Sequence, residues 1–368
     1  MFKEAKKVNS LYVHIPFCNH ICEYCDFVKL IYNEEFAKDY VDSLIKEIRS
    51  YNIDKVNTIY IGGGTPTSLN IDLFEKVLSE LSPKLNDGGE FTCEANVESL
   101  NKDKLLLLKK YGVNRLSIGV ESTHDDLLKF LGRHHTFSDV KTCIKLAKEI
   151  GFTNINVDLI YGYKGHTLKL LKEDLENILS LDTPHISIYS LIVDKGSIFY
   201  NKGVTEQDSD ESREYYDLIL KTLREHGYKR YEISNFAKPG YESRHNLTYW
   251  RDEEYYGVGL GANGYLNGER YANSKSLYIY NKEYKAESEV ITEEMAKEEF
   301  LLTNLRLEDG FLLPRYKDRF GIDFLEEHKE AISKLVKNGY AFIDENNFRL
   351  TDDGLMIIDS LILDLFNR

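Results

Sequence analysis

The feature that most constrains this chain is a strict alternation of strand-like and helix-like segments over its first 200 residues. Short runs rich in β-branched residues alternate with longer segments whose apolar residues recur at i, i+3 and i+4, a pattern typical of parallel βα units. The strand-like runs are 11–17, 56–62, 90–96, 115–122, 154–162 and 185–191. Six units are two short of a closed eight-fold barrel, so we expect an α/β fold built on an open, partial (βα)6 barrel. Active sites in such barrels lie at the carboxyl ends of the strands.

Three cysteines follow the first predicted strand with the spacing C-x3-C-x2-C: Cys18, Cys22 and Cys25. Three thiolates on one tight loop can ligate three irons of a [4Fe–4S] cluster and leave the fourth iron open. Structural zinc would need a second ligand pair, which the sequence lacks. A disulfide framework does not suit 5 cysteines in 368 residues without a signal peptide. Cys93 and Cys143 lie on apolar faces and are expected in the core.

A second motif, GGGTP at residues 62–66, follows the second predicted strand. Three glycines can bring bare backbone close to a ligand, and Pro66 stiffens the exit from the turn. Together with the cysteine triad, this run resembles the radical S-adenosylmethionine (SAM) superfamily. The resemblance implies that SAM chelates the open iron through its amino and carboxylate groups, and that one electron cleaves it to a 5′-deoxyadenosyl radical. Tyr24 matches the aromatic residue that the superfamily places against the adenine.

Charged residues stand at the predicted carboxyl ends of apolar strands: Glu94, Glu121 and Asp158, with Arg133 after a short helix. Burying an unpaired carboxylate is costly, so these groups must be satisfied by a ligand or by each other. A carboxylate there can bind ribose hydroxyls, and an arginine can pair with the carboxylate of SAM. A buried network of salt bridges is the alternative, and the residues alone leave both interpretations open.

Within the superfamily, the first 200 residues resemble the coproporphyrinogen-oxidase-like branch through YVHIPFC, GGGTPT, RLSIGVES, NVDLIYG and HISIYSL. This resemblance implies SAM contacts at Tyr12, Tyr24, Gly63, Gly64, Thr65, Glu94, Glu121, Arg133, Asp158 and Ile192. Glu121 departs from the branch, which usually has glutamine there. The departure replaces an amide that can donate a hydrogen bond with a carboxylate that only accepts.

Two further departures separate the chain from the oxygen-independent coproporphyrinogen III oxidases. Those enzymes carry a fourth nearby cysteine where this chain has Phe27, and a long N-terminal extension where only 17 residues precede Cys18. Both features resemble the HemW-type heme chaperones, paralogues that lack the oxidase activity.

A motif in the second half, HNxxYW at residues 245–250, is also characteristic of those chaperones and contains the only tryptophan of the chain. A neutral His245 imidazole is a good axial ligand for heme iron, and Arg244 and Arg251 could meet propionates. A structural turn that anchors the C-terminal part is equally compatible with the chemistry, and the resemblance favours heme. Asn263 stands where the family more usually has histidine, so a second histidine ligand would be missing.

The strand–helix alternation ends near Asp208, which predicts two domains: the barrel at 1–207 and an α+β C-terminal domain at 208–368. The latter ends in helix, helix, hairpin and helix, resembling a winged-helix-like module. A net charge of −14 and a pI near 5.3 argue against nucleic acid or an anionic membrane as partner. No apolar run approaches the roughly 18 residues of a membrane span. We therefore expect a cytoplasmic protein.

Two functions remain at this stage. The first is a heme chaperone that holds a [4Fe–4S] cluster and SAM, binds heme, and passes it to a soluble or membrane-associated acceptor protein. An electron donor such as a flavodoxin or ferredoxin would reduce the cluster. The alternative is an oxygen-independent coproporphyrinogen III oxidase, in which the radical abstracts hydrogen from a propionate with loss of carbon dioxide. Phe27, the short N-terminus and HNxxYW favour the chaperone.

Overall fold

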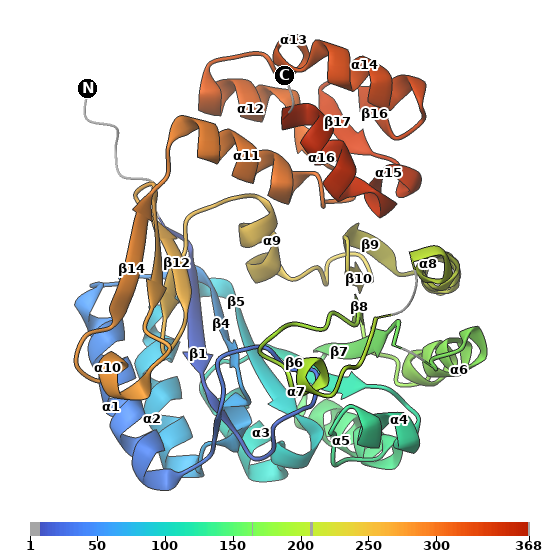
Figure 1. Cartoon of the computed structure of the whole chain (residues 1–368). Coiled ribbons are helices and arrows are strands. Elements are labelled where there is room, and N and C mark those ends of the chain that lie inside the picture. Colours follow the sequence, from blue (N-terminus) through green and yellow to red (C-terminus); the bar gives the residue numbers. More distant parts are fainter. Residues whose placement is uncertain (1–7, 164, 207–208, 367–368) are drawn as a thin grey trace.

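A computed structural model describes residues 8–163, 165–206 and 209–366, and its central feature is an open, curved sheet of nine strands (Figure 1). Strands β1 to β8 of this sheet and the edge strand β11 are parallel, whereas β10 and β9 are antiparallel additions at the other edge. In spatial order the strands are β11 (Tyr256–Val258), β1 (Ser10–Ile15), β4 (Val56–Gly63), β5 (Leu85–Asn96), β6 (Arg115–Glu121), β7 (Asn154–Tyr161), β8 (His185–Ser190), β10 (Asn235–Ala237) and β9 (Lys229–Glu232). The six predicted strands are confirmed, and the described sheet does not close.

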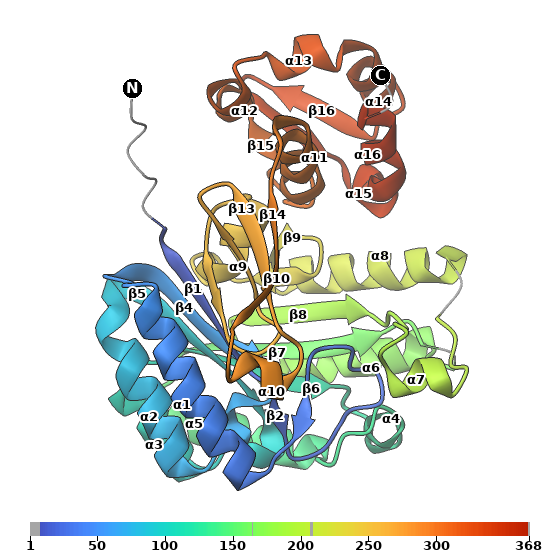
Figure 2. The ribbon, with the colours of Figure 1, turned by 60° about the vertical axis from the view of Figure 1, so that its left-hand side comes forward.

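Helices cover the convex face of the sheet (Figure 2). They are α1 (Glu34–Ser50), α2 (Ile71–Leu81), α3 (Lys102–Lys110), α4 (Asp125–Phe130), α5 (Phe137–Ile150) and α6 (Leu168–Leu179). Five of the six begin at a residue whose side chain accepts a hydrogen bond from the third helical N–H: Asn33, Asn70, Asn101, Thr136 and Thr167. These caps satisfy backbone donors that the helix leaves free, which explains why the helices start there.

The two faces of the sheet differ in chemistry because side chains alternate along each strand. In β6, Leu116, Ile118 and Val120 are fully buried in the main hydrophobic core under the helices. The alternate residues Arg115 and Ser117 line a cavity on the concave face. The interior of the partial barrel is therefore polar, unlike the apolar layers that fill a closed barrel.

The sheet continues beyond residue 208, because α8 (Ser209–Glu225) leads into β9 and β10, and β11 pairs with β1. Between β10 and β11 lies a short helix, α9 (Arg244–Trp250), which carries HNxxYW. The domain boundary between 207 and 208 stays a prediction. A separate antiparallel sheet follows, made of β12 (Asn263–Leu266), β13 (Glu269–Asn273) and β14 (Lys285–Val290).

The C-terminal module has its own core around Phe300, Phe311, Phe324 and Phe348. Its small sheet has the order β15-β17-β16. The elements are α11 (Glu293–Asn304), β15 (Phe311–Leu312), α12 (Leu313–Phe320), α13 (Phe324–Glu327), α14 (Lys329–Lys337), β16 (Ala341–Asp344), β17 (Asn347–Leu350), α15 (Asp352–Met356) and α16 (Ile358–Phe366). The predicted hairpin is present, whereas the segment expected as one helix is divided at His328. No helix in the described ranges is both long and apolar enough to cross a membrane.

Candidate functional site

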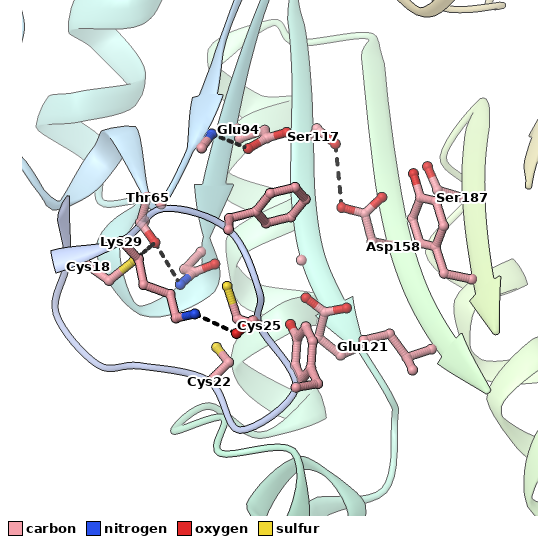
Figure 3. Close-up of a pocket in the computed structure, with 18 of the residues that line it drawn as sticks. Cys18, Cys22, Cys25, Lys29, Thr65, Glu94, Ser117, Glu121, Asp158 and Ser187 are labelled. Atoms are coloured by element: carbon pink, nitrogen blue, oxygen red, sulfur yellow. Dashed lines mark hydrogen bonds between the residues drawn. The ribbon is translucent and has the colours of Figure 1, made fainter. Parts of the chain in front are cut away.

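A cavity of about 390 Å³ occupies the concave face of the sheet, and the cysteine loop covers the carboxyl ends of the strands at its mouth (Figure 3). Its wall includes all three predicted cluster cysteines and the glycine turn after β4. The close-up shows thiols at one side and carboxylates from three successive strands opposite them. The topology therefore brings the two sequence motifs and the strand-end charges to one place, as the parallel arrangement predicts.

The cysteine loop is closed by a short parallel pair, β2 (Phe17–Cys18) with β3 (Leu30–Ile31). All three thiols are free. Burial raises the pKa of the Cys25 thiol to about 11, so the protein needs a bound cation to hold this group as a thiolate. Two donors point at sulfur: Thr65 Oγ1 lies 3.6 Å from Cys18 Sγ, and Arg133 Nη1 lies 3.3 Å from Cys22 Sγ.

The donor set suits a cluster better than a single ion. Within the described ranges, no three His, Cys, Asp or Glu side chains are grouped tightly enough to hold one metal ion. A [4Fe–4S] cluster instead takes each thiolate at a separate iron, so its ligands stand apart around the mouth. Donors to the sulfurs are the outer contacts that tune such clusters. The three thiols therefore fit the predicted cluster.

The glycine turn is required by close packing. Gly63 has φ of 111°, a conformation that side chains rarely adopt, and a Cβ there would meet the His14 ring at 2.5 Å. A Cβ on Gly64 would lie 2.9 Å from Cys18 Sγ. The bare backbone thus allows the turn to lie directly against the cysteine loop.

Three carboxylates, Glu94, Glu121 and Asp158, face the cavity from neighbouring strands, and burial raises the pKa of Glu94 and Asp158. Glu94 accepts hydrogen bonds from Tyr60 Oη (2.6 Å) and the Gly63 N–H (3.1 Å), and burial raises its pKa. Burial and the nearby Glu121 charge raise the pKa of Asp158 to about 7. Glu121 itself has φ of 66°, a strained conformation for a non-glycine residue. Strain of this kind concentrates at functional sites.

Arg133 connects these carboxylates to the cysteine loop. It donates from Nη2 to the Gly119 carbonyl (2.7 Å) and to Asn96 Oδ1 (3.0 Å), and Glu121 Oε1 lies 3.8 Å from the same nitrogen. The predicted pairing among the charged groups is thus present between Arg133 and Glu121. Glu94 and Asp158 rely on neutral donors, and each carboxylate oxygen retains room for a further hydrogen bond.

Nine of the ten predicted SAM contacts line the cavity, and Tyr12 does not. Its hydroxyl bonds to His14 Nδ1 (3.0 Å), and its ring lies 6.2 Å from that of Tyr60, which does line the cavity. Ile192 and Phe27 lie at the mouth with 66% and 63% of their surface exposed.

Sequence reasoning missed several lining residues on the polar faces of the strands. They are Asn96, Arg115, Ser117, Asn156 and Ser187. Their signal was a two-residue period, since polar residues recur at alternate positions in β5, β6, β7 and β8. Such alternation marks one polar face of a strand, here the face toward the cavity.

The HNxxYW helix closes the opposite end of the barrel interior. His245 is fully buried, and its ring bonds through Nδ1 to Thr58 Oγ1 (2.8 Å) and through Nε2 to Tyr249 Oη (2.7 Å). The Glu90 carboxylate accepts from the N–H groups of Arg244 and His245, both at 3.0 Å. Burial and the Arg115 charge lower the pKa of His245 to about 3, so the imidazole is neutral.

A cysteine loop over the carboxyl ends of an open parallel sheet, beside a glycine turn, defines a radical SAM protein. The Radical SAM superfamily profile matches residues 12–178, and the HemN C-terminal domain profile matches residues 291–357. The solved structure of coproporphyrinogen III oxidase (HemN) from Escherichia coli, a radical SAM enzyme, superposes with a TM-score of 0.85. That match has 21% identity and covers 98% of this chain and 90% of that one. At this identity the likeness establishes the fold alone.

Relatives with higher sequence identity show to which family of radical SAM proteins the chain belongs. The heme chaperone HemW of Lactococcus lactis is 38% identical over 98% of this chain and 99% of its own length. HemW of Bacillus subtilis is 40% identical, covering 95% and 97%, and HemW of Escherichia coli is 31% identical, covering 97% of each. The chain belongs to the HemW family of radical SAM proteins. Membership of the superfamily implies a [4Fe–4S] cluster and SAM.

Proposed function

We propose that this protein is a heme chaperone that binds heme and passes it to an acceptor protein. The similarity to proteins named heme chaperone HemW over almost the whole chain carries this proposal. Phe27 supports it, because an exposed aromatic side chain stands at the mouth where the oxidases have a cysteine. A flat apolar side chain beside the cluster loop suits contact with a porphyrin face.

The cavity residues provide the SAM site in this proposal. Cys18, Cys22 and Cys25 would hold the cluster, which when bound supplies an electron and an open iron position to SAM. Arg133 is placed to pair with the SAM carboxylate, since it already spans from Cys22 to Glu121. Glu94 and Asp158 offer acceptor oxygens for ribose hydroxyls. The remaining contacts that line the cavity are Tyr24, Gly63, Gly64, Thr65, Glu121 and Ile192, whereas Tyr12 lies outside the cavity wall, next to Tyr60.

Heme ligation by His245 is the least direct part of the proposal. Both ring nitrogens already have partners and the side chain is buried, so ligation requires α9 to move and Tyr249 or Thr58 to release the ring. His245→Ala should abolish or strongly weaken heme binding if this movement occurs, measured by titration of the Soret band. Tyr249→Phe is the matched control, because it removes one partner of the ring and keeps the imidazole. Unchanged heme affinity in His245→Ala would remove His245 from the site.

The decisive experiment compares heme transfer with oxidase turnover. The cluster-reconstituted protein is incubated anaerobically with SAM, a reductant and coproporphyrinogen III, and protoporphyrinogen and 5′-deoxyadenosine are measured together. In parallel, the heme-loaded protein is mixed with an apo-form heme acceptor. We expect transfer of heme without decarboxylation. Catalytic formation of protoporphyrinogen would assign the chain to the alternative function, the oxygen-independent coproporphyrinogen III oxidase.

Several partners follow from the proposal. A radical SAM protein requires a reductant, and a flavodoxin or ferredoxin is the class we propose. The heme acceptor is a protein, soluble or membrane-associated. The cytoplasmic location remains a prediction from the sequence.

A further inference from the structure

One buried cation in the cavity, Arg115, has no hydrogen-bonded or ion-paired partner among the described residues. Arg115 is the first residue of β6, 1% exposed, and it lines the same cavity as the cysteine loop. Its Nε is buried without a hydrogen-bond partner, and none of its nitrogens pairs with a carboxylate in the part of the chain that the structure describes. Burying an unpaired guanidinium is expensive, so a chain retains one only where something offsets the cost.

The other buried arginines show how unusual this is. Arg133 makes three hydrogen bonds at the mouth. Arg230 donates to Glu308, Tyr216 and Asp352. Arg115 also has polar neighbours, but they form their hydrogen bonds with other residues. Glu94, for example, accepts from Tyr60 and Gly63.

A second unpartnered group lies beside Arg115. Thr92 pairs with Arg115 in the register of β5 and β6, so the two side chains point to the same face of the sheet. Thr92 is fully buried, and its Oγ1 also lacks a partner. A guanidinium and a hydroxyl side by side present several N–H and O–H donors in one direction.

Arg115 lies at the inner end of the cavity, and Thr92 lies beside it on the same face of the sheet without forming part of the cavity wall. Arg115 begins its strand, whereas the cysteine loop covers the strand ends that follow Glu121. Asn246 of α9 also lines the cavity, so the HNxxYW helix forms part of its inner wall. A ligand that enters at the mouth meets the predicted SAM contacts first and Arg115 last.

We propose that Arg115, with the Thr92 hydroxyl beside it, forms a carboxylate-binding subsite at the inner end of the cavity. A carboxylate matches the planar fork of an arginine and carries one charge. A phosphate dianion would be repelled by Glu94, Glu121 and Asp158, which share the cavity. Heme carries such groups in its two propionates, whereas the carboxylate of SAM is already assigned to the open iron and to Arg133 at the mouth. The inference therefore rests on the proposed function.

The test uses the cluster-reconstituted protein and paired ligands that differ only in the carboxylate. Dissociation constants are measured anaerobically for heme, for heme dimethyl ester and for SAM. Arg115→Gln should weaken heme binding by about tenfold or more and leave the binding of the dimethyl ester and of SAM unchanged. A loss of affinity confined to heme assigns the subsite to a propionate. Arg115→Lys keeps the charge but not the planar fork of the guanidinium, so its affinity should lie between those of the wild type and Arg115→Gln.

Thermal unfolding without SAM or heme provides a second measurement. Removing a buried charge that has no hydrogen-bonded or ion-paired partner among the described residues should leave the Tm of Arg115→Gln equal to or above that of the wild type. Arg230→Gln, the matched control, breaks a satisfied buried network and should lower Tm without changing ligand affinity. Unchanged heme affinity in Arg115→Gln, or equal losses for heme and its dimethyl ester, would overturn the subsite. Failure of the wild type to bind heme would count against the proposed function, whereas heme binding that Arg115→Gln leaves unchanged would count against the subsite alone.

Discussion

The two ends of the barrel interior each carry one of the two motifs that predict cofactor binding. The hydrogen bonding of the side chains that would bind the cofactor differs between these ends. At the mouth, the thiols of Cys18, Cys22 and Cys25 are free, and two neighbouring side chains point donors at sulfur. At the inner end, His245 has both ring nitrogens bonded and no exposed surface. The sulfurs can keep their hydrogen-bond donors when they bind iron, whereas the imidazole of His245 must first lose a partner before it can bind a metal.

The largest effect should come from removing a thiol at the mouth. Cys22→Ala leaves two protein ligands for the cluster, so we expect loss of most of the reconstituted iron and sulfide, measured by chemical analysis. Cys143→Ala is the matched control, because Cys143 is a core residue on α5 outside the cavity. A full cluster in Cys22→Ala, or an equal loss of iron and sulfide in Cys143→Ala, would mean that the mouth cysteines and the core cysteines do not differ in cluster binding.

An intermediate effect should come from undocking the motif helix. Glu90 accepts hydrogen bonds from two backbone N–H groups of α9. Glu90→Gln places an amide NH2 group, which can only donate, against one of these N–H groups. The free energy of unfolding should fall by about 1–3 kcal/mol in a denaturant titration. Glu287→Gln, on the exposed strand β14, should change it by less than about 0.5 kcal/mol. Equal stability of the two variants would mean that Glu90 does not hold the inner end closed.

The third effect, in the middle of the cavity, should appear only as the pH changes. Asp158 titrates at about 7 in the folded protein and near 3.9 when unfolded. The folded state therefore binds more protons between these values, and wild-type stability should decrease as pH rises through this window. Asp158→Asn lacks this loss, so its Tm relative to the wild type should increase from pH 5 to pH 8. Asp364→Asn, an exposed control on α16, should show a constant difference. If the Tm difference between Asp158→Asn and the wild type stayed constant or decreased over this pH range, burial would not be the cause of the raised pKa of Asp158.

Local sequence patterns predicted most of the fold and the mouth of the site. The alternation of strands and helices, the cysteine spacing and the glycine run each act over a few residues, so they can be read directly. Because parallel strands end at one edge, Glu94, Glu121 and Asp158 were also expected together, and the structure places all three on one cavity. Tyr12 was expected there too and lies one side chain away, behind Tyr60.

What the sequence by itself determined is the set of short-range signals: an α/β partial barrel, three thiols on one loop in the spacing that predicts a cluster, and a family motif at 245–250. Only the tertiary structure decided which groups are left without partners. The bonds of His245 to Thr58 and Tyr249, and the unpaired state of Arg115, depend on strands and helices far apart in the chain. Hydrogen-bond satisfaction is a property of three-dimensional neighbours, and for this reason the sequence alone could mark His245 but not reveal Arg115.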